Sequence, residues 1–228
     1  QQKKVKQAVV NICGLGLYEL SINGKKVGNS EFTPLISDYD KSVWYNTYDV
    51  TTLLQKGNNA IGVLLGNGFY NVQGGRYRKL LISFGPPTVR LQLTIHYEDG
   101  TSQTVASDKT WKYDFSPVTF NCIYGGEDYD ARQEQKGWNM AKFNDTLWNQ
   151  VVVQEGPKGV LRPQIAAPVA IMEHYSPISA THLPDSLLAA ASKSTKRKVD
   201  ASAIVLDMGQ NLRSEEHTSE LQSHEPIS

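Results

Sequence analysis

The segment from Gly125 to Arg132, GGEDYDAR, places three carboxylates and one arginine directly after two glycines. Carboxylates are hard oxygen ligands that suit calcium, and they can also line a sugar site. Glu127, Asp128 and Asp130 are therefore candidate ligands. In an extended strand Asp128 and Asp130 point to one face and Glu127 to the other, so the three acids converge only if the chain bends. A purely structural ion pair between Asp130 and Arg132 explains the same residues.

Two further loops carry oxygen ligands. Asp38, Asp40 and Asn67 stand in the turn-like stretches DYD and GNG. A sandwich of strands could bring these loops together at one end, where their oxygens would add to a calcium or sugar site. Asp and Asn also stabilise turns by bonding to nearby backbone, and that role needs no ligand. Both interpretations stay open at this point.

The sequence predicts that hairpins position these loops. From Thr88 to Tyr97 apolar and polar residues alternate with period two, which is typical of a half-buried strand. The following EDGT turn predicts a return strand from Thr101 to Ala106. Tyr18 to Ile22 alternates in the same way and runs into Asn23-Gly24, the pair that best suits a type I′ turn.

More strands are expected between these hairpins. Val43 to Tyr48 is rich in aromatic and β-branched residues, and Ala60 to Leu65 is a short apolar run that predicts a strand buried on both faces. Between them, Thr51 to Lys56 could form one helical turn that Gly57 stops. Many short strands separated by Gly, Pro and Asn turns predict an all-β fold, a jelly-roll-like β-sandwich.

A domain boundary is predicted near Gly156-Pro157-Lys158-Gly159, where turn residues flank a lysine. Residues 1–160 would form the first β-sandwich, and residues 161–212 would begin a second, incomplete one. Within the second segment, Ala203 to Leu206 is the clearest candidate strand.

Composition excludes several classes of function. The 228 residues include 23 basic and 23 acidic side chains, so the chain lacks the basic surface that binds nucleic acid or an anionic membrane. A run of about 18 apolar residues, which a spanning helix needs, is missing. Cys13 and Cys122 have no metal-ligand spacing and are expected to be buried apolar residues. The N-terminus shows no signal-peptide pattern.

Five stretches, taken in order, resemble the bacterial α-L-rhamnosidases of glycoside hydrolase family 78. They are GLGLYELSINGKKVG (Gly14 to Gly28), DYDKSVWYNTYDVTTLL (Asp38 to Leu54), GNNAIGVLLGNGFY (Gly57 to Tyr70), GGEDYDAR (Gly125 to Arg132) and DMGQN (Asp207 to Asn211). The resemblance covers roughly residues 5–212. It implies the module order of that family, in which two β-sandwiches precede an (α/α)6 barrel that holds the catalytic carboxylates.

By this resemblance the chain holds the first module and the opening of the second, and the catalytic domain is missing. Inverting hydrolysis needs an acid and a base about 6.5 to 9.5 Å apart, and in the family both come from the barrel, so no catalytic residue is expected here. The implied role is an accessory module that binds an L-rhamnose-containing glycan weakly, in some relatives through Ca²⁺. The alternative is a structural module that only packs on the missing catalytic domain. The resemblance implies a periplasmic or secreted protein.

The last residues depart from the family pattern. Arg213 to His224, RSEEHTSELQSH, resembles the translation of a common sequencing adapter. Residues 213–228 are therefore expected to be an artefactual, disordered tail. The alternative is a genuine polar tail, which would also be disordered because it has too little apolar surface to offset the entropy of ordering. His217 and His224 are accordingly not taken as metal ligands.

Overall fold

A computed structural model describes residues 3–72, 74, 80–182, 193 and 204–209. Its elements are β-strands and two single-turn 3-10 helices, which confirms the all-β class. The chain separates into two compact units, Gln1–Ile171 and Met172–Ser228, and each is described by itself.

The elements of the first unit are short except for three strands of the main sheet. They are β1 (Val5–Leu15), β2 (Leu17–Ile22), β3 (Lys25–Lys26), β4 (Ser30–Glu31), β5 (Ser42–Asp49), η1 (Thr51–Leu53), β6 (Ile61–Gly66), β7 (Asn71–Val72), β8 (Ile82–Ser83), β9 (Thr88–Tyr97), β10 (Ser102–Ala106), β11 (Lys112–Tyr113), β12 (Val118–Cys122), β13 (Gly126–Tyr129), η2 (Ala131–Gln133), β14 (Asn149–Gln150), β15 (Val160–Pro163) and β16 (Val169–Ala170).

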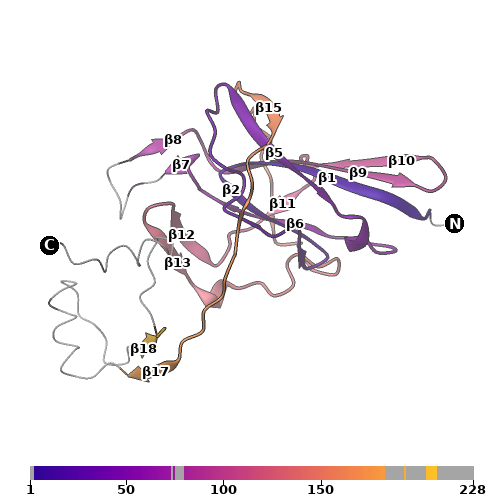
Figure 1. The fold of residues 1–228 in the computed structure, drawn as a ribbon. Coiled ribbons are helices and arrows are strands. Elements are labelled where there is room, and N and C mark those ends of the chain that lie inside the picture. Colours follow the sequence, from indigo (N-terminus) through magenta and orange to yellow (C-terminus); the bar gives the residue numbers. More distant parts are fainter. Residues whose placement is uncertain (1–2, 73, 75–79, 183–192, 194–203, 210–228) are drawn as a thin grey trace, which may run out of the picture. The chain divides into compact units, whose positions relative to one another are not determined.

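The main sheet has five strands in the order β10-β9-β1-β5-β15 (Figure 1). The long central strand β1 pairs antiparallel with β9 on one side and with β5 on the other. The edge strand β15 runs parallel to β5. The predicted strand from Thr88 to Tyr97 is β9, and its predicted return strand is β10, so this hairpin is confirmed.

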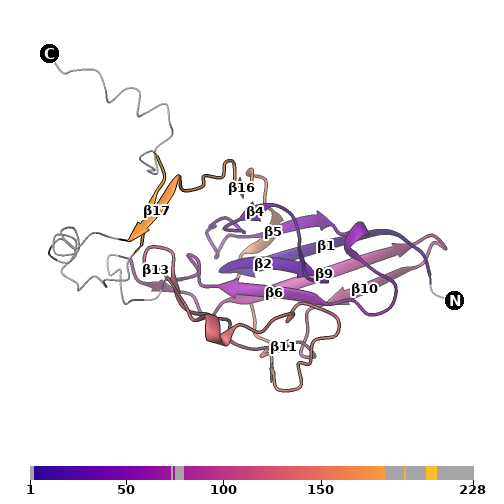
Figure 2. The same ribbon diagram turned by 90° about the horizontal axis from the view of Figure 1, so that it is seen from below.

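A three-stranded sheet, in the order β3-β2-β6, lies against one face of the main sheet (Figure 2). The chain passes from β1 to β2 through Gly16, which has a φ of 106°. A Cβ at this position would lie 2.3 Å from the carbonyl oxygen of Gly66. Only glycine combines this backbone conformation with so close an approach, so Gly16 lets the chain change sheets.

The core lies between these two sheets. It is formed by alternate residues of three strands and is centred on Ala8, Val10, Ile12, Tyr18, Leu20, Ile22, Leu91 and Leu93. Each fully buried Ile or Leu contributes roughly 1.5–3 kcal/mol relative to an exposed side chain. The period-two alternation of the sequence therefore selects the face that each sheet buries.

The predicted turns between strands are also present. Asn23 and Gly24 have φ values of 50° and 79°, as a type I′ turn between β2 and β3 requires. The predicted helical turn is η1, and Gly57, which follows it, has a φ of 88°.

One prediction about burial is wrong. The run from Ala60 to Leu65 forms β6, but this strand is not buried on both faces, because Leu64 is 38% exposed. The reason is that the smaller sheet packs on the core through one face, so Ile61, Val63 and Leu65 of β6 meet the core and Leu64 points to the other face. Cover on the other face includes Trp138, whose ring would lie 2.7 Å from a Cβ on Gly62.

A second apolar cluster includes Cys13, Leu15, Tyr39, Val43 and Tyr70. Cys13 and Cys122 are both buried free thiols, which confirms the prediction for the two cysteines. Burial raises the pKa of Cys13 to about 11. This thiol therefore stays protonated and packs as an apolar group.

The first compact unit ends at Ile171, eleven residues beyond the boundary predicted at residue 160. The added segment includes β15, which joins the main sheet, and β16, which pairs with β4. In the second unit β17 (Ser179–His182) pairs antiparallel with β18 (Ile204–Asp207), where Ala203 to Leu206 was predicted to form a strand. The division into domains stays a prediction, and the predicted tail at 213–228 lies outside the described residues.

Candidate functional site

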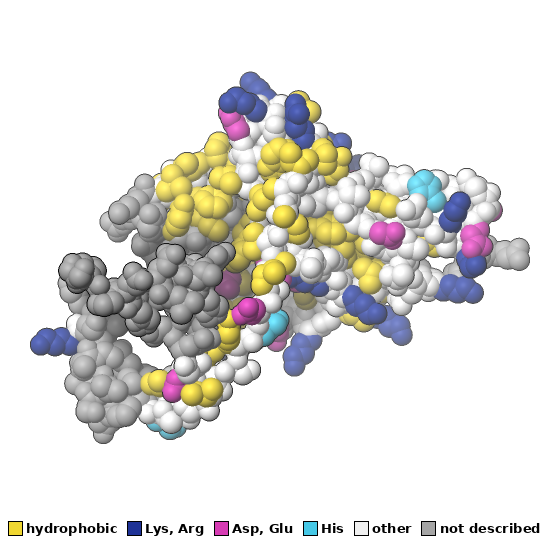
Figure 3. Space-filling view, viewed as in Figure 1, with side chains coloured by type: hydrophobic (Ala, Val, Ile, Leu, Met, Phe, Trp, Pro, Cys, Tyr) yellow, Lys and Arg dark blue, Asp and Glu magenta, His cyan; other side chains and the backbone are white. Residues whose placement is uncertain are grey.

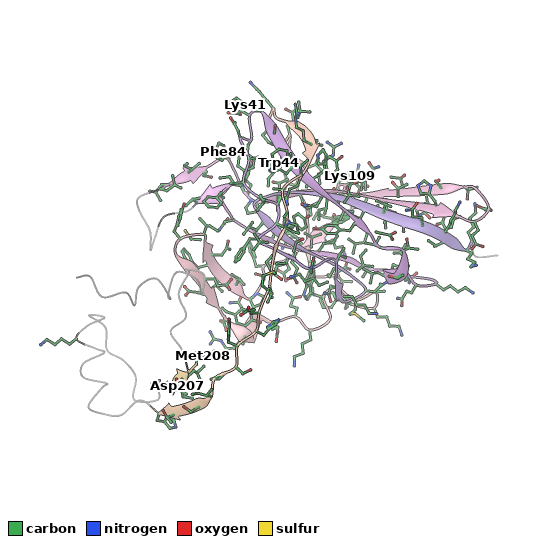
Figure 4. All side chains as sticks on the ribbon, in the orientation of Figure 1. Lys41, Trp44, Phe84, Lys109, Asp207 and Met208 are labelled. Atoms are coloured by element: carbon green, nitrogen blue, oxygen red, sulfur yellow. The ribbon has the colours of Figure 1, made fainter. Side chains whose placement is uncertain are left out.

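The loop that carries Asp38 and Asp40 and the loop that carries Asn67 lie together at one end of the first unit. Tyr39, between the two candidate aspartates, packs edge-on against Tyr70, with the ring centroids 5.0 Å apart. Phe84, labelled in Figure 4, lies 5.3 Å from the Tyr39 ring. The structure thus brings the loop of Asp38 and Asp40 beside the loop of Asn67 through an aromatic contact.

Asn67 belongs to a network of three amides. Its Nδ2 donates to the backbone oxygen of Asn121 at 3.0 Å, and its backbone N–H donates to the Oδ1 of Asn121 at 2.7 Å. Its Oδ1 accepts from Asn71 Nδ2 at 2.8 Å. Both polar groups of the Asn67 side chain therefore bind within the fold. Sequence reasoning missed Asn71 and Asn121, since Asn121 is 54 residues away and no spacing connects it to Asn67.

Asp38 also has a local partner. Its carboxylate accepts from the backbone N–H of Asp40 at 3.3 Å and forms a 2.8 Å ion pair with Lys41. The hydrogen bond and charge of Lys41 lower the pKa of Asp38. The exposed Asp40 carboxylate, in contrast, has no hydrogen bond or ion pair with any of the residues that the structure describes.

Asp130 forms the ion pair that was the structural alternative. Its two carboxylate oxygens accept from Arg132 Nε and Nη2, each at 2.7 Å. Its Oδ1 also accepts from the backbone N–H of Arg132, and with this hydrogen bond Asp130 caps the start of η2. Hydrogen bonding from Arg132 lowers the pKa of Asp130 to about 2. This carboxylate is therefore ionised above strongly acidic pH and oriented by its own chain.

The hairpin of β12 and β13 presents Glu127 differently. Glu127 is exposed and lies opposite Asn121 in the strand register, next to the amide network. Its carboxylate makes no hydrogen bond or ion pair within the described part of the chain. Asp128, the next residue, is exposed and lies opposite Phe120. The strand thus turns neighbouring acids to opposite faces, as expected for extended backbone.

Two exposed aromatic residues belong to the same hairpin as this acid. Tyr124 is 48% exposed and packs against Phe69, with the ring centroids 5.9 Å apart. Tyr129 is 56% exposed, and its hydroxyl donates to Glu134 at 3.2 Å. We call Tyr124, Glu127 and Tyr129 the hairpin surface. Aromatic faces beside a carboxylate can pack on the C–H groups of a polyol and accept its hydroxyl protons.

The neighbouring hairpin of β7 and β8 has a different surface. Figure 3 shows hydrophobic side chains gathered in the region of these two strands. Leu81, Ile82 and Phe84 are 57%, 39% and 52% exposed. Such clusters are typical of surfaces that another protein or domain covers.

Within the described residues, no group of three or more His, Cys, Asp or Glu side chains could hold a metal ion. Of the six candidate ligands, Asp38, Asn67 and Asp130 bind within the fold, whereas Asp40 and Glu127 keep uncommitted carboxylates. Calcium takes six to eight oxygen ligands, which is more than these two carboxylates supply. Calcium binding at this end therefore stays a prediction. No helix in the described part of the chain is long and apolar enough to cross a membrane.

Two packed sheets, one mixed and one antiparallel, with an aromatic and acidic end define a β-sandwich module. The family model that matches residues 3–173 is the alpha-L-rhamnosidase N-terminal domain, and the chain belongs to this family. This confirms the resemblance deduced from the sequence motifs.

Known α-L-rhamnosidases are much longer than this chain. The α-L-rhamnosidase of Formosa agariphila is 45% identical over 150 residues, which are 64% of this chain and 16% of that protein. The solved enzyme of Aspergillus terreus is 33% identical with a TM-score of 0.76, and covers 93% of this chain and 23% of that one. The Streptomyces avermitilis enzyme, solved with L-rhamnose, is 34% identical with a TM-score of 0.70, over 79% of this chain and 18% of that one. The chain therefore spans less than a quarter of each relative.

Proposed function

We propose that this chain is a non-catalytic accessory module of an enzyme that hydrolyses terminal α-L-rhamnose, and that it binds L-rhamnose-containing glycans weakly through the hairpin surface. The observation that carries the proposal is the presence of two exposed tyrosines, Tyr124 and Tyr129, in the same hairpin as the uncommitted Glu127 carboxylate. The solved complex of the Streptomyces avermitilis relative with L-rhamnose supports the choice of sugar.

The chemistry of the hairpin surface fits a neutral sugar. A deoxy sugar such as rhamnose has a methyl group and ring C–H groups that can pack on a tyrosine face. Its hydroxyls can donate to Glu127, which has no competing partner in the described chain. The surface is open, so a ligand keeps much of its contact with water, and the binding is expected to be weak.

Calorimetry with L-rhamnose tests the glycan site. Weak binding is expected in the wild type, with a clear loss in Tyr129→Ala and in Glu127→Gln. Tyr113→Ala is a matched control, because Tyr113 is 41% exposed on β11, outside the hairpin surface. Adding a chelator shows whether Ca²⁺ takes part. No binding at millimolar rhamnose with calcium present would rule out this glycan site.

The catalytic part of the proposal has its own test. Hydrolysis needs an acid and a base on either side of the glycosidic bond, and the proposed module supplies no such pair. The chain should therefore release no product from an aryl α-L-rhamnoside. Turnover above a buffer blank that is lost on mutating an acid of this chain would contradict the non-catalytic role.

A structural role is the second candidate, and the exposed Leu81, Ile82 and Phe84 favour it. In this case the module packs on the catalytic domain through the β7–β8 hairpin and binds no sugar. The chain should then bind the separately produced remainder of a similar rhamnosidase, and Leu81→Lys should weaken this binding while the melting temperature is unchanged. Equal binding by wild type and variant would contradict this role for the hairpin.

A further inference from the structure

A hollow lies on the outer face of the main sheet, the face opposite the core between the two sheets. It has a volume of about 230 Å³, and the residues that line it are Asn11, Ile12, Cys13, Tyr45, Arg90, Gln92 and Leu161. We call it the Arg90 hollow. It uses none of the candidate residues at the loop end of the sandwich.

Strand register explains why these residues meet. Arg90 lies opposite Cys13, and Gln92 lies opposite Asn11, in the pairing of β9 with β1. Directly opposed residues on one face of a sheet have Cβ atoms about 4.5–5.5 Å apart, so their side chains form adjacent rows. Cys13 is short and stands between longer side chains, which leaves a depression above it. Leu161, on the edge strand β15, closes one side.

The polar groups around this depression are largely uncommitted. Arg90 makes no hydrogen bond or ion pair with any described residue, and neither do the amide of Gln92 and the hydroxyl of Tyr45. Asn11 accepts from Thr47 through its Oδ1 at 2.6 Å, which leaves its Nδ2 hydrogens to donate. The hollow therefore combines a mostly apolar lining with several hydrogen-bond donors, and the charge of Arg90 has no carboxylate partner among the described residues.

A polar outer face is ordinary for an antiparallel sheet with one solvated side. The Arg90 hollow differs because an arginine, two amides and a tyrosine converge on one depression without binding each other. A guanidinium offers two parallel N–H groups that match a carboxylate or a related oxyanion. Amides bind sugar hydroxyls, and the half-buried Tyr45 adds a ring face.

We propose that the Arg90 hollow binds one anionic sugar unit, with its carboxylate or sulfate on Arg90 and its hydroxyls on Asn11 and Gln92. Sites for drug-sized ligands measure about 300–1,000 Å³, so a volume of about 230 Å³ suits a single ring of a longer chain. The choice of a sugar as the ligand rests on the proposed function, whereas the position of the site does not. The module would thereby select glycans in which an acidic residue accompanies the rhamnose.

Titration of the full chain with three probes tests the proposal. Methyl glucuronide supplies a carboxylate, glucose 6-sulfate supplies a sulfate, and methyl glucoside is the neutral control. At least one of the two charged sugars should bind about ten-fold more tightly than the neutral one, as expected for a charge-assisted hydrogen bond. The charged sugar that binds identifies the source of the anion. Amide shifts in NMR spectra should map to β1 and β9.

Arg90→Gln should abolish the preference for the charged sugar. Lys56→Gln removes the same charge from an exposed loop beside Gly57 and should leave the preference intact. Thermal unfolding of both variants shows whether they are folded. Should Arg90→Gln fail to fold, Gln92→Ala provides a second test, because it should weaken binding of the charged sugar.

Several outcomes would overturn the proposal. These are equal affinity for charged and neutral sugars, a preference that survives Arg90→Gln, or shifts that map elsewhere. Arg90-dependent binding of an acidic peptide but of neither charged sugar would also overturn it, since the hollow would then be a protein-docking surface. Rhamnose binding at the hairpin surface should not change in Arg90→Gln, so failure of either site is seen independently of the other.

Discussion

The two faces of the main sheet are built from the same strands but serve different purposes. Along β9, Leu91 and Leu93 are buried in the core, whereas Arg90 and Gln92 on the opposite face are exposed. The second sheet covers the inner residues, and their burial stabilises the fold. The outer residues keep polar groups without partners inside the described chain. Adjacent positions of one strand can therefore be assigned to stability and to binding.

The largest expected effect separates these two faces directly. Leu91→Ala should destabilise the protein by about 2–5 kcal/mol, because Leu91 is 1% exposed and truncation leaves a cavity. Gln92→Ala, the adjacent outer residue, should stay within about 0.5 kcal/mol. Urea unfolding measures both. Similar losses in the two variants would show that the outer face also contributes to folding.

A smaller effect is expected where the chain leaves the main sheet to cover its inner face. Gly16→Ala should cost more than about 2 kcal/mol, since it combines an unfavourable φ with a contact to the Gly66 oxygen. Gly100→Ala is the control, with a φ of 83° and no atom within 4 Å of the added Cβ. It should cost about 1–2 kcal/mol from backbone strain alone. Thermal melts with equal losses would contradict the close approach at Gly16.

Substitutions at the loop end should cost less stability than those in the core and more than those on the outer face. Asn121→Ala removes the acceptor of the partly buried Asn67 N–H, and the unpaired donor should cost about 1–2 kcal/mol. Asn144→Ala removes a similar bond to Thr146 in an exposed turn and should cost less, because water replaces it. Denaturant midpoints of the two variants make the comparison. A larger loss of stability for Asn144→Ala than for Asn121→Ala would contradict the structural role of the amide network.

The smallest effect concerns the ion pair of Asp130 and Arg132. An unfolded Asp titrates near 3.9, and the folded pKa of Asp130 is lowered to about 2. The stabilisation by this pair is therefore complete above about pH 4 and is lost as the pH falls from about 4 to about 2. In NMR titrations Arg132→Gln should raise the midpoint of Asp130 toward 3.9. Lys41→Gln should leave it unchanged, and a shift there would show that the assignment of the partner is wrong.

Much of the fold could be predicted because period-two patterns and turn pairs are local. The hairpins β9–β10 and β2–β3 follow from alternation and from Asn23-Gly24, and both are present as predicted. The burial of β6 could not be predicted, since an apolar run does not show whether one or both faces of its sheet are covered. The hydrogen bonds of the candidate side chains could not be predicted either, because those of Asn67 depend on Asn121, which is distant in sequence.

The sequence by itself determined the all-β class, the family and the bidentate partner of Asp130, which is only two residues away. Only the tertiary structure decided which polar groups stay free to bind. Arg90 and Asn11 meet because the register of β9 on β1 places them in adjacent rows of one face. Register is a property of two strands joined through the packed core, so it cannot be read from either strand alone.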